Sequence, residues 1–324
     1  MKGLKWGIID FHCDALSKLQ ENPNIRFEED ERLDVSAKKL RQGGVGLQCF
    51  AVFIDDEQEK ARIGRVLEQI SLYRTEVEKA GIPLITSRQE LASLNAAGGG
   101  TGGMLSLEGA HGLEGNLKYV QNCYDLGVRF LGITWNHANW AADGIMEPRG
   151  GGFTQKGLEL IKLCHELGII LDVSHLSLKG FWELTEAAEK AGKPFIASHS
   201  NSINICDHPR NLSDEQIRTI VRLGGRIGLT FVPPFVKASG PVKMTDLLPH
   251  LEHMCSLGAE NHLMFGSDFD GIDEHIEGLE NAACYVKWKE LLLKYYAEPL
   301  VDKWLSLNAM RFLQTWLPAT KKAL

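Results

Sequence analysis

Histidine and carboxylate side chains stand directly after several short apolar runs of this sequence. His12 and Asp14 form an H-x-D pair after the run at 6–10, and the two-residue period of an extended chain places both on one face. Both can therefore reach a single metal ion, whereas Cys13 would point the other way. The residues of this kind that follow or end such runs are His12, Asp14, Glu108, His175, His199 and Asp268. Nitrogen and oxygen donors without thiolate are typical of catalytic zinc, with manganese or cobalt as substitutes in vitro.

The number of donors predicts a pair of metal ions that share a bridging ligand. Three histidines and two carboxylates are too few for two closed sites and about right for two open ones. With a bridging hydroxide and an ionised Asp268, the charges of two Zn²⁺ ions, Asp14 and Glu108 cancel. Such a pair would turn the bridging water into a hydroxide nucleophile, and a nearby carboxylate such as Asp268 could take up its proton. Asp270 competes for this role, and we favour Asp268 because it lies closer to the preceding apolar run.

The apolar runs are the elements that must position these side chains. They are nearly continuous rather than alternating, as expected for parallel strands buried on both faces. Eight of them occur, at residues 6–10, 45–53, 104–108, 129–134, 169–173, 194–198, 226–231 and 262–266. Eight strands with intervening helices predict an α/β fold, a (β/α)8 TIM barrel formed by one domain, residues 1–324, with an open doubly wound sheet as the alternative. In such a barrel the carboxyl ends of the strands carry the active site.

Segments with apolar residues at three- and four-residue spacing lie between most of these runs and predict helices. They are residues 57–80, 117–126, 155–167, 181–191, 214–223 and 245–257, followed by 280–296 and 299–316. Residues 82–86 look like an additional strand, so we expect a small extra strand/helix insertion near residues 57–103. The glycine-rich run at 98–103 lacks the Lys-Ser/Thr of a phosphate loop and predicts a flexible loop.

Composition and charge disfavour several classes of function. The formal net charge is −7, from 35 basic and 42 acidic residues, which gives no general attraction to nucleic-acid phosphates. No apolar stretch approaches the roughly 18 residues needed to cross a bilayer, and the first residues lack the apolar run of a signal peptide. We therefore expect a cytoplasmic protein without nucleic-acid or membrane partners. The seven cysteines are scattered, which predicts reduced, mostly buried thiols.

Six short motifs occur in a specific order along nearly the whole chain. They are Asp10-Phe11-His12-Cys13-Asp14, Ser106-Leu107-Glu108-Gly109, Asp172-Val173-Ser174-His175, Ser198-His199-Ser200, His208-Pro209-Arg210-Asn211 and Gly266-Ser267-Asp268-Phe269-Asp270-Gly271. In this combination the sequence resembles the membrane (renal) dipeptidase family, zinc dipeptidases on an amidohydrolase-like barrel. The resemblance implies two Zn²⁺ ions per chain, one bound by His12 and Asp14, the other by His175 and His199, with Glu108 as the bridge.

The same resemblance implies a substrate and the residues that bind it. The family hydrolyses dipeptides, often tolerates a D-residue at the C-terminal position and is usually dimeric, so we expect a homodimer. Arg210 would hold the substrate carboxylate in a forked pair, and Asp268 would be the proton shuttle. Trp135 stands where the family often carries a histidine that contacts substrate and helps to polarise the carbonyl. Either His137 takes over that contact, or the metal acts alone and Trp135 forms a hydrophobic pocket wall.

Two other functions fit the same candidate ligands. A metal-dependent amidohydrolase that acts on a cyclic amide or lactam would keep the metals but would need no carboxylate clamp, and Arg210 argues against it. A metal-binding or carrier protein without turnover would need no proton shuttle, and Asp268 argues against that function. The remaining histidines have weaker arguments. His111 would lie close to the site, and the pair His250 and His253 lacks the glutamate of H-E-x-x-H and is predicted to be on the surface or structural.

Overall fold

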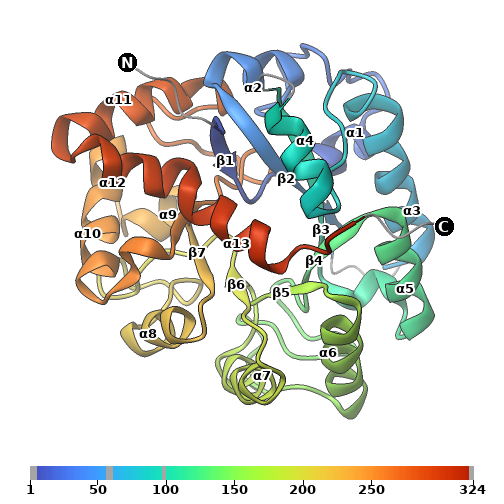
Figure 1. Ribbon diagram of the computed structural model, residues 1–324. Helices are drawn as coiled ribbons and strands as arrows, with labels where there is room; N and C mark the ends of the chain where they lie inside the picture. The colour runs from blue at the N-terminus through green and yellow to red at the C-terminus, as the bar shows by residue number, and fades with distance from the viewer. Residues whose placement is uncertain (1–5, 56–60, 97–99, 321–324) are drawn as a thin grey trace.

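Eight parallel strands close into one barrel in the computed structural model, which describes residues 6–55, 61–96 and 100–320 (Figure 1). The strands are β1 Ile8–Asp10, β2 Val45–Phe53, β3 Gly102–Glu108, β4 Val128–Gly132, β5 Ile170–Asp172, β6 Ile196–Ala197, β7 Arg226–Leu229 and β8 Leu263–Phe265. Each strand pairs with the next along the chain, and β8 pairs with β1 through Phe265 and Asp10. This closure confirms the predicted TIM barrel and excludes the open doubly wound sheet.

Helices surround the barrel, as Figure 1 shows. They are α1 Ala15–Glu21, α2 Ala37–Gly43, α3 Ile63–Leu72, α4 Arg88–Ala96, α5 Leu117–Leu126, α6 Gln155–Leu167, α7 Leu178–Ala191, α8 Asp214–Arg222, α9 Pro233–Val236, α10 Leu248–Ser256, α11 Tyr285–Tyr295, α12 Glu298–Asp302 and α13 Asn308–Trp316. The predicted bounds of α5 and α6 are confirmed to the residue. The helix predicted at 57–80 begins at Ile63 within the described residues and continues into a π-helical turn, Tyr73–Val77.

Buried apolar side chains form two layers, one inside the barrel and one between the barrel and its helices. The inner layer includes Ile9, Leu47, Met104 and Phe130, and side chains of α13 such as Phe312 join it. Figure 1 shows α13 lying across one end of the barrel. The amino ends of the strands are therefore filled by hydrophobic packing, which leaves the carboxyl ends for polar side chains.

The extra strand expected at residues 82–86 is wrong. Only Leu84 makes a bridge, to Gly103, before the chain turns into α4. The turn has a local cause, because the Ser87 hydroxyl caps the backbone N–H of Glu90, and the Glu90 carboxylate accepts hydrogen bonds from the backbone and hydroxyl of Thr86. The insertion between β2 and β3 therefore consists mainly of α3, its π-helical turn and α4.

The flexible loop expected at residues 98–103 is also wrong in part, because Gly102 and Gly103 begin β3, while residues 98–99 lie outside the described residues. A Cβ at Gly102 would come within 2.7 Å of the Leu94 side chain. A Cβ at Gly103 would overlap the hydroxyl of Tyr73, a buried residue that hydrogen-bonds Ile82. These glycines are therefore present for close packing rather than for flexibility.

All seven cysteines are free thiols and six are fully buried, which confirms the prediction made from their spacing. Among the described residues, no helix combines the length and the apolar character needed to cross a membrane. The location of the protein in the cell stays a prediction.

Candidate metal centre

His12 and Asp14 enter the barrel mouth because the alternation of β1 breaks after the strand ends. Ile9 and Phe11 point into the barrel, and unbroken alternation would send Cys13 there too. Cys13 instead packs in the outer layer, so the residues on either side of it turn toward the mouth. His12 Nε2 lies 3.4 Å from Asp14 Oδ2, and both side chains are buried.

Asp10 fixes this turn to the neighbouring loop after β8. Its carboxylate accepts hydrogen bonds from the backbone N–H of His12 at 3.2 Å and from the backbone and hydroxyl of Ser267 at 2.9 and 2.6 Å. Ser267 also donates to the His12 carbonyl at 3.1 Å. The loops that carry His12 and Asp268 are thus held together by a buried carboxylate that contacts the backbone of His12 and the neighbour of Asp268, Ser267.

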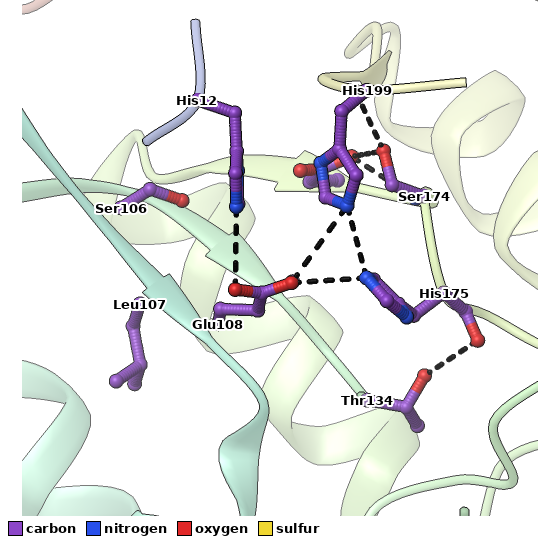
Figure 2. Close-up of a pocket in the computed structure, with 10 residues that line it drawn as sticks. His12, Ser106, Leu107, Glu108, Thr134, Ser174, His175 and His199 are labelled. Carbon is purple, nitrogen blue, oxygen red and sulfur yellow. Dashed lines mark hydrogen bonds and ion pairs between the residues drawn. The ribbon is translucent and has the colours of Figure 1, made fainter. Parts of the chain in front are cut away.

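Glu108 stands at the centre of the cluster, with one carboxylate oxygen toward each side (Figure 2). Its Oε2 lies 3.3 Å from His12 Nε2, and its Oε1 lies 3.0 Å from His175 Nε2 and 3.8 Å from His199 Nε2. Burial opposes ionisation, but the neighbouring His12 holds the pKa of Glu108 well below its ordinary value. A charged carboxylate with its two oxygens divided between two groups of donors has the geometry of a bridge.

His175 and His199 each have their second ring nitrogen occupied by a protein group. His175 Nδ1 lies 3.0 Å from the side-chain oxygen of Asn136, which only accepts, so Nδ1 carries the proton and Nε2 presents a lone pair. Burial lowers the pKa of His175 to about 4 and holds the pKa of His199 well below its usual range. Both rings are therefore neutral near pH 7, the form that binds metals.

A chain of hydroxyl groups orients His199. Ser174 Oγ donates to Asp172 Oδ1 at 2.9 Å and lies 3.2 Å from Ser198 Oγ, which lies 2.7 Å from His199 Nδ1. Because the Ser174 proton is committed to Asp172, Ser198 donates to Ser174 and accepts from the imidazole. The order of donors leaves the lone pair of His199 on Nε2, 2.9 Å from Nε2 of His175.

Two groups of side chains in this cluster are close enough to hold a cation. His12, Glu108 and His199 form one, and His12, Asp14 and Asp268 form the other, with the donor atoms of each group within 4.8 Å of one another. Both ring nitrogens of His12 and Oδ1 of Asp14 are buried without a hydrogen-bond partner among the described residues. Unpaired buried acceptors are costly, and a bound cation removes that cost. The all-nitrogen and oxygen donor set fits zinc.

Asp268 lies at the edge of the cluster, with Oδ1 3.6 Å from His12 Nε2. Burial raises the pKa of Asp268 to about 8, and the charges of Asp14 and Glu108 act in the same direction. Its backbone has a φ of 68°, in the left-handed region. Three residues later, a Cβ at Gly271 would approach Asp268 Oδ1 to 2.8 Å and would overlap Asp14 Oδ2. Glycine at this position therefore leaves room for the carboxylates of Asp14 and Asp268.

Asp270, the competing candidate for the proton shuttle, faces away from the cluster. Its two oxygens accept hydrogen bonds from the backbone N–H groups of Asp34 and Val35 at 2.7 and 2.9 Å, and Lys18 Nζ lies 3.5 Å away. These contacts anchor the loop before α2. The geometry therefore favours Asp268 over Asp270.

Arg210 is a buried cation to which the described residues offer no hydrogen-bond partner. Its side chain is 4% exposed, and its Nε and both terminal nitrogens make no hydrogen bond within the described part of the chain. The guanidinium lies 5.4 Å from the ring centre of Phe235, and the adjacent Asn211 ties the loop to the carbonyls of Cys206 and Phe235. Burial lowers the pKa of Arg210 to about 10, so the group stays positive near neutral pH. Such a group is suited to a forked pair with an anion that comes from outside.

Trp135 and His137 lie in the loop after β4, but in different surroundings. Trp135 is half-buried, with its ring centre 6.3 Å from that of His175 and 5.1 Å from that of Phe53. His137 is exposed. Between them, the side-chain oxygen of Asn136 accepts a hydrogen bond from the imidazole of His175. A substrate contact of His137 stays a prediction.

The sequence motifs contained several supporting residues without indicating their roles. Asp10, Asp172, Ser174 and Ser198 stand one to three positions before a candidate ligand, but the hydrogen bonds between Ser174 and Ser198 and between Asp10 and Ser267 join segments that follow different strands. Asn136 carried no signal except its place after a strand. The other histidines are structural: His250 accepts from the backbone of Ser202 and lies 3.0 Å from the Val236 carbonyl, His253 lies 2.7 Å from Asp214, and His111 lies 2.5 Å from the Ile54 carbonyl.

Known proteins share this sequence pattern and this fold. The sequence model of the family described as membrane dipeptidase (peptidase family M19) matches residues 4–322. A Klebsiella pneumoniae protein, described as an uncharacterized protein in the pqqA 5′ region, is 34% identical over 218 residues, or 64% of this chain and 79% of that protein. The crystal structure of dipeptidase AC, a metallo peptidase of family M19, has a TM-score of 0.88 at 24% identity and covers 98% of this chain and 100% of its own. A metallo peptidase from Rhodobacter sphaeroides, liganded with a phosphinate mimic of the dipeptide L-Ala-D-Ala, has a TM-score of 0.86 at 24% identity and covers 96% of this chain and 99% of its own.

Proposed function

Because the chain belongs to the membrane dipeptidase family, we propose that it is a zinc-dependent dipeptidase that holds two Zn²⁺ ions and accepts a D-residue at the C-terminal position of its substrate. The observation that carries this proposal is Arg210, a buried guanidinium without a partner in the described part of the chain, on the same barrel mouth as the ligand cluster. A free C-terminal carboxylate supplies the forked anion that this group lacks.

Four candidate ligands divide into two pairs around the fifth, Glu108. His12 and Asp14 would hold one ion and His175 and His199 the other, because His12, which lies beside Asp14, faces Oε2 of Glu108, whereas His175 and His199 face Oε1. Two zinc ions bound by these residues would polarise the scissile carbonyl and activate a water molecule for attack. Asn136 and Ser198 keep the imidazole lone pairs of the second group directed inward.

Asp268 would move the proton. Its carboxylate lies beside His12, where it can accept the proton that the attacking water loses and donate it to the leaving amine. A group with this double task works best when its pKa lies near the working pH, and burial raises the pKa of Asp268 toward that range. The charge of bound cations would act against burial.

Arg210 would set the length of the substrate. The forked pair positions a carboxylate at one place on the mouth, so a peptide with further residues after the scissile bond would place its peptide backbone there instead. The Rhodobacter sphaeroides peptidase, whose ligand mimics L-Ala-D-Ala, makes a D-residue at this position the first stereochemistry to test here.

An amidohydrolase that acts on a cyclic amide or lactam remains the second candidate, because it would use the same ligands. It gives Arg210 no anion to bind, which is why we place it second. A carrier without turnover is set aside, because the chain belongs to a family of hydrolases. We also propose that the protein is a homodimer, which light scattering of the purified protein would test.

The decisive experiment compares dipeptides with their C-terminal amides. Zinc-loaded protein should hydrolyse L-L and L-D dipeptides, and conversion of the carboxylate to an amide should lower kcat/KM by an amount equivalent to about 2–5 kcal/mol. Arg210→Ala should lower kcat/KM for the acid similarly and make the enzyme indifferent to the amide, because both changes remove one interaction. Arg210→Lys should recover only part of the loss. Equal hydrolysis of acid and amide by the unmodified protein would refute the clamp and favour the amidohydrolase.

A further inference from the structure

Two aromatic side chains stand beside the ligand cluster without a role in binding metal or moving protons. The rings of Phe53 and Trp135 meet edge to face, with centres 5.1 Å apart and an interplanar angle of 68°. Both are half-buried, so each keeps part of its surface open at the mouth of the barrel. The ring of Trp135 is also 6.3 Å from that of His175.

The strand register places Phe53 at the height of the central carboxylate. Phe53 is the last residue of β2 and is the direct partner of Glu108 on β3. Partners on adjacent strands point to the same face of a sheet, and the contacts of Glu108 with three histidines show that this face is the interior of the mouth. The side chain of Phe53 therefore points toward the space in which substrate must lie.

The backbone beneath Trp135 is pinned to the candidate ligands rather than free. The hydroxyl of Thr134 and the backbone N–H of Ile145 both donate to the carbonyl of His175, at 3.1 and 2.8 Å. Further along the same loop, Asp143 and Arg149 form a two-fold hydrogen-bonded ion pair. A tryptophan held at a fixed place acts as a rigid surface for whatever binds against it.

The order of the strands around the barrel separates Phe53 and Trp135 from Arg210, the proposed carboxylate clamp. Phe53 ends β2 and Trp135 follows β4, whereas Arg210 follows β6 and rests against Phe235, which follows β7. In a ring of eight strands β2 lies opposite β6, and β3, the strand between β2 and β4 that carries Glu108, lies opposite β7. A dipeptide whose carboxylate is held by Arg210 and whose scissile bond lies over the cluster must direct its N-terminal residue toward Phe53 and Trp135.

We propose that Phe53 and Trp135 form the wall of a specificity pocket for the side chain of the N-terminal residue, and that this pocket selects apolar residues, aromatic and large aliphatic ones above all. The inference rests on the proposed dipeptidase function and adds the substrate class to it. Burial of an apolar side chain against these aromatic rings is favourable, because it removes apolar surface from water. A charged side chain would lose its hydration there without gaining a hydrogen bond in return.

The test is a series of X-Ala dipeptides with X as Gly, Leu, Phe, Asp and Lys, assayed with the zinc-loaded protein. Phe-Ala and Leu-Ala should exceed Gly-Ala in kcat/KM by roughly tenfold or more, with the Asp and Lys substrates lowest. Trp135→Ala should bring the ratio of Phe-Ala to Gly-Ala close to one. Trp135→Phe should keep most of the preference, because it retains an aromatic face. A parallel Ala-X series, which varies the other residue, should keep its order in every variant.

Trp316→Ala is the matched control, because Trp316 is also half-buried but lies at the opposite end of the barrel, against Lys193. It should leave the substrate ratio unchanged. A flat X-Ala series, a preference for Lys, or a preference that survives Trp135→Ala would each overturn the inference while hydrolysis of dipeptides upholds the proposed function. If zinc-loaded protein hydrolyses neither series, the proposed function fails and the pocket fails with it.

Discussion

Glu108 shows how a single residue organises the site. Its two oxygens face different histidines, with Oε2 toward His12 and Oε1 toward His175. The two histidines that face its Oε1, His175 and His199, are neutral imidazoles whose protons are directed away from it by Asn136 and Ser198. The chemistry therefore depends on residues that never touch the substrate as much as on those that do.

Substitutions of the two aspartates that follow β8, Asp268 and Asp270, should have different effects. Asp268→Asn removes the proton acceptor with little change in shape and should lower kcat by about 10²-fold or more, with zinc content and melting temperature nearly unchanged. Asp270→Asn replaces an acceptor of two backbone N–H groups and should cost about 1–3 kcal/mol of unfolding free energy with a much smaller effect on kcat. Kinetics and thermal denaturation of both variants decide the assignment, and the reverse pattern would make Asp270 the shuttle.

Loss of the Ser198 hydroxyl should weaken metal binding. Ser198→Ala removes the hydroxyl that fixes the proton of His199 and should weaken zinc binding by about 10- to 100-fold, measured by competition with a chelator. Ser200→Ala is the control two residues away, since its hydroxyl is buried without a hydrogen-bond partner among the described residues. Ser200→Ala should leave zinc affinity unchanged. If both variants bind zinc as tightly as the original protein, the hydroxyl chain does not tune the ligand.

Sequence reasoning reached the candidate ligands but not their supporting contacts, and the reason is physical. A histidine or carboxylate at the end of an apolar run can be found from local order alone, because parallel strands bring their carboxyl ends together. The link from Asp172 to His199 crosses from β5 to β6 through two hydroxyl groups, and no spacing within one segment encodes it. The separation of Asp268 from Asp270 likewise required the distant backbone of residue 34.

At the scale of elements, the strands and most helices follow from apolar runs and their spacing. The short helices α1, α2 and α9 were not predicted, and the two contradicted predictions lie between β2 and β3. Residues 82–86 do not form the expected strand, because the hydrogen bonds that cap α4 hold the adjacent backbone in a turn. A pattern of apolar residues does not reveal such side-chain hydrogen bonds. The glycines at 102–103 look like loop residues because a glycine-rich run does not show that Leu94 and Tyr73 pack against them. Local capping decided the first case, and packing between elements decided the second.

The close packing around Gly103 should make the fold sensitive to a larger residue at this position. Gly103→Ala places a methyl group against the buried ring of Tyr73 and should lower the free energy of unfolding by about 1–3 kcal/mol, measured by urea denaturation. Adding Tyr73→Phe removes the atom that the methyl group meets first, so the double variant should lose less than the sum of the single variants. Strict additivity of the two changes would mean that the contact with Tyr73 does not explain the glycine.

At the scale of the whole molecule, the two ends of the barrel have different tasks. The amino end is closed by α13 and the inner apolar layer, which supply stability, while the carboxyl end collects buried carboxylates and imidazoles that by themselves oppose folding. Bound metal would compensate that cost. The protein is therefore expected to be less stable without its ions than with them.

Metal removal tests this balance. Dialysis against a chelator should abolish dipeptide hydrolysis, and zinc should restore it with about two ions per chain by elemental analysis. The melting temperature should fall on chelation and recover with zinc, because free metal at a thousandfold excess over Kd stabilises the folded state by about 4 kcal/mol. Full activity in protein proven to be metal-free would contradict the proposed mechanism.

The fixed position of Arg210 has a consequence for when this protein can act. If Arg210 is the proposed clamp, a guanidinium held beside Asn211 and Phe235 could not follow a longer chain outward, and a peptide would bind only when one residue remains beyond the bond to be cut. Other peptidases would then have to act first, and their smallest fragments would be the substrates of this protein. The buried charge would thereby restrict the protein to the last step of peptide breakdown, in which free amino acids are released.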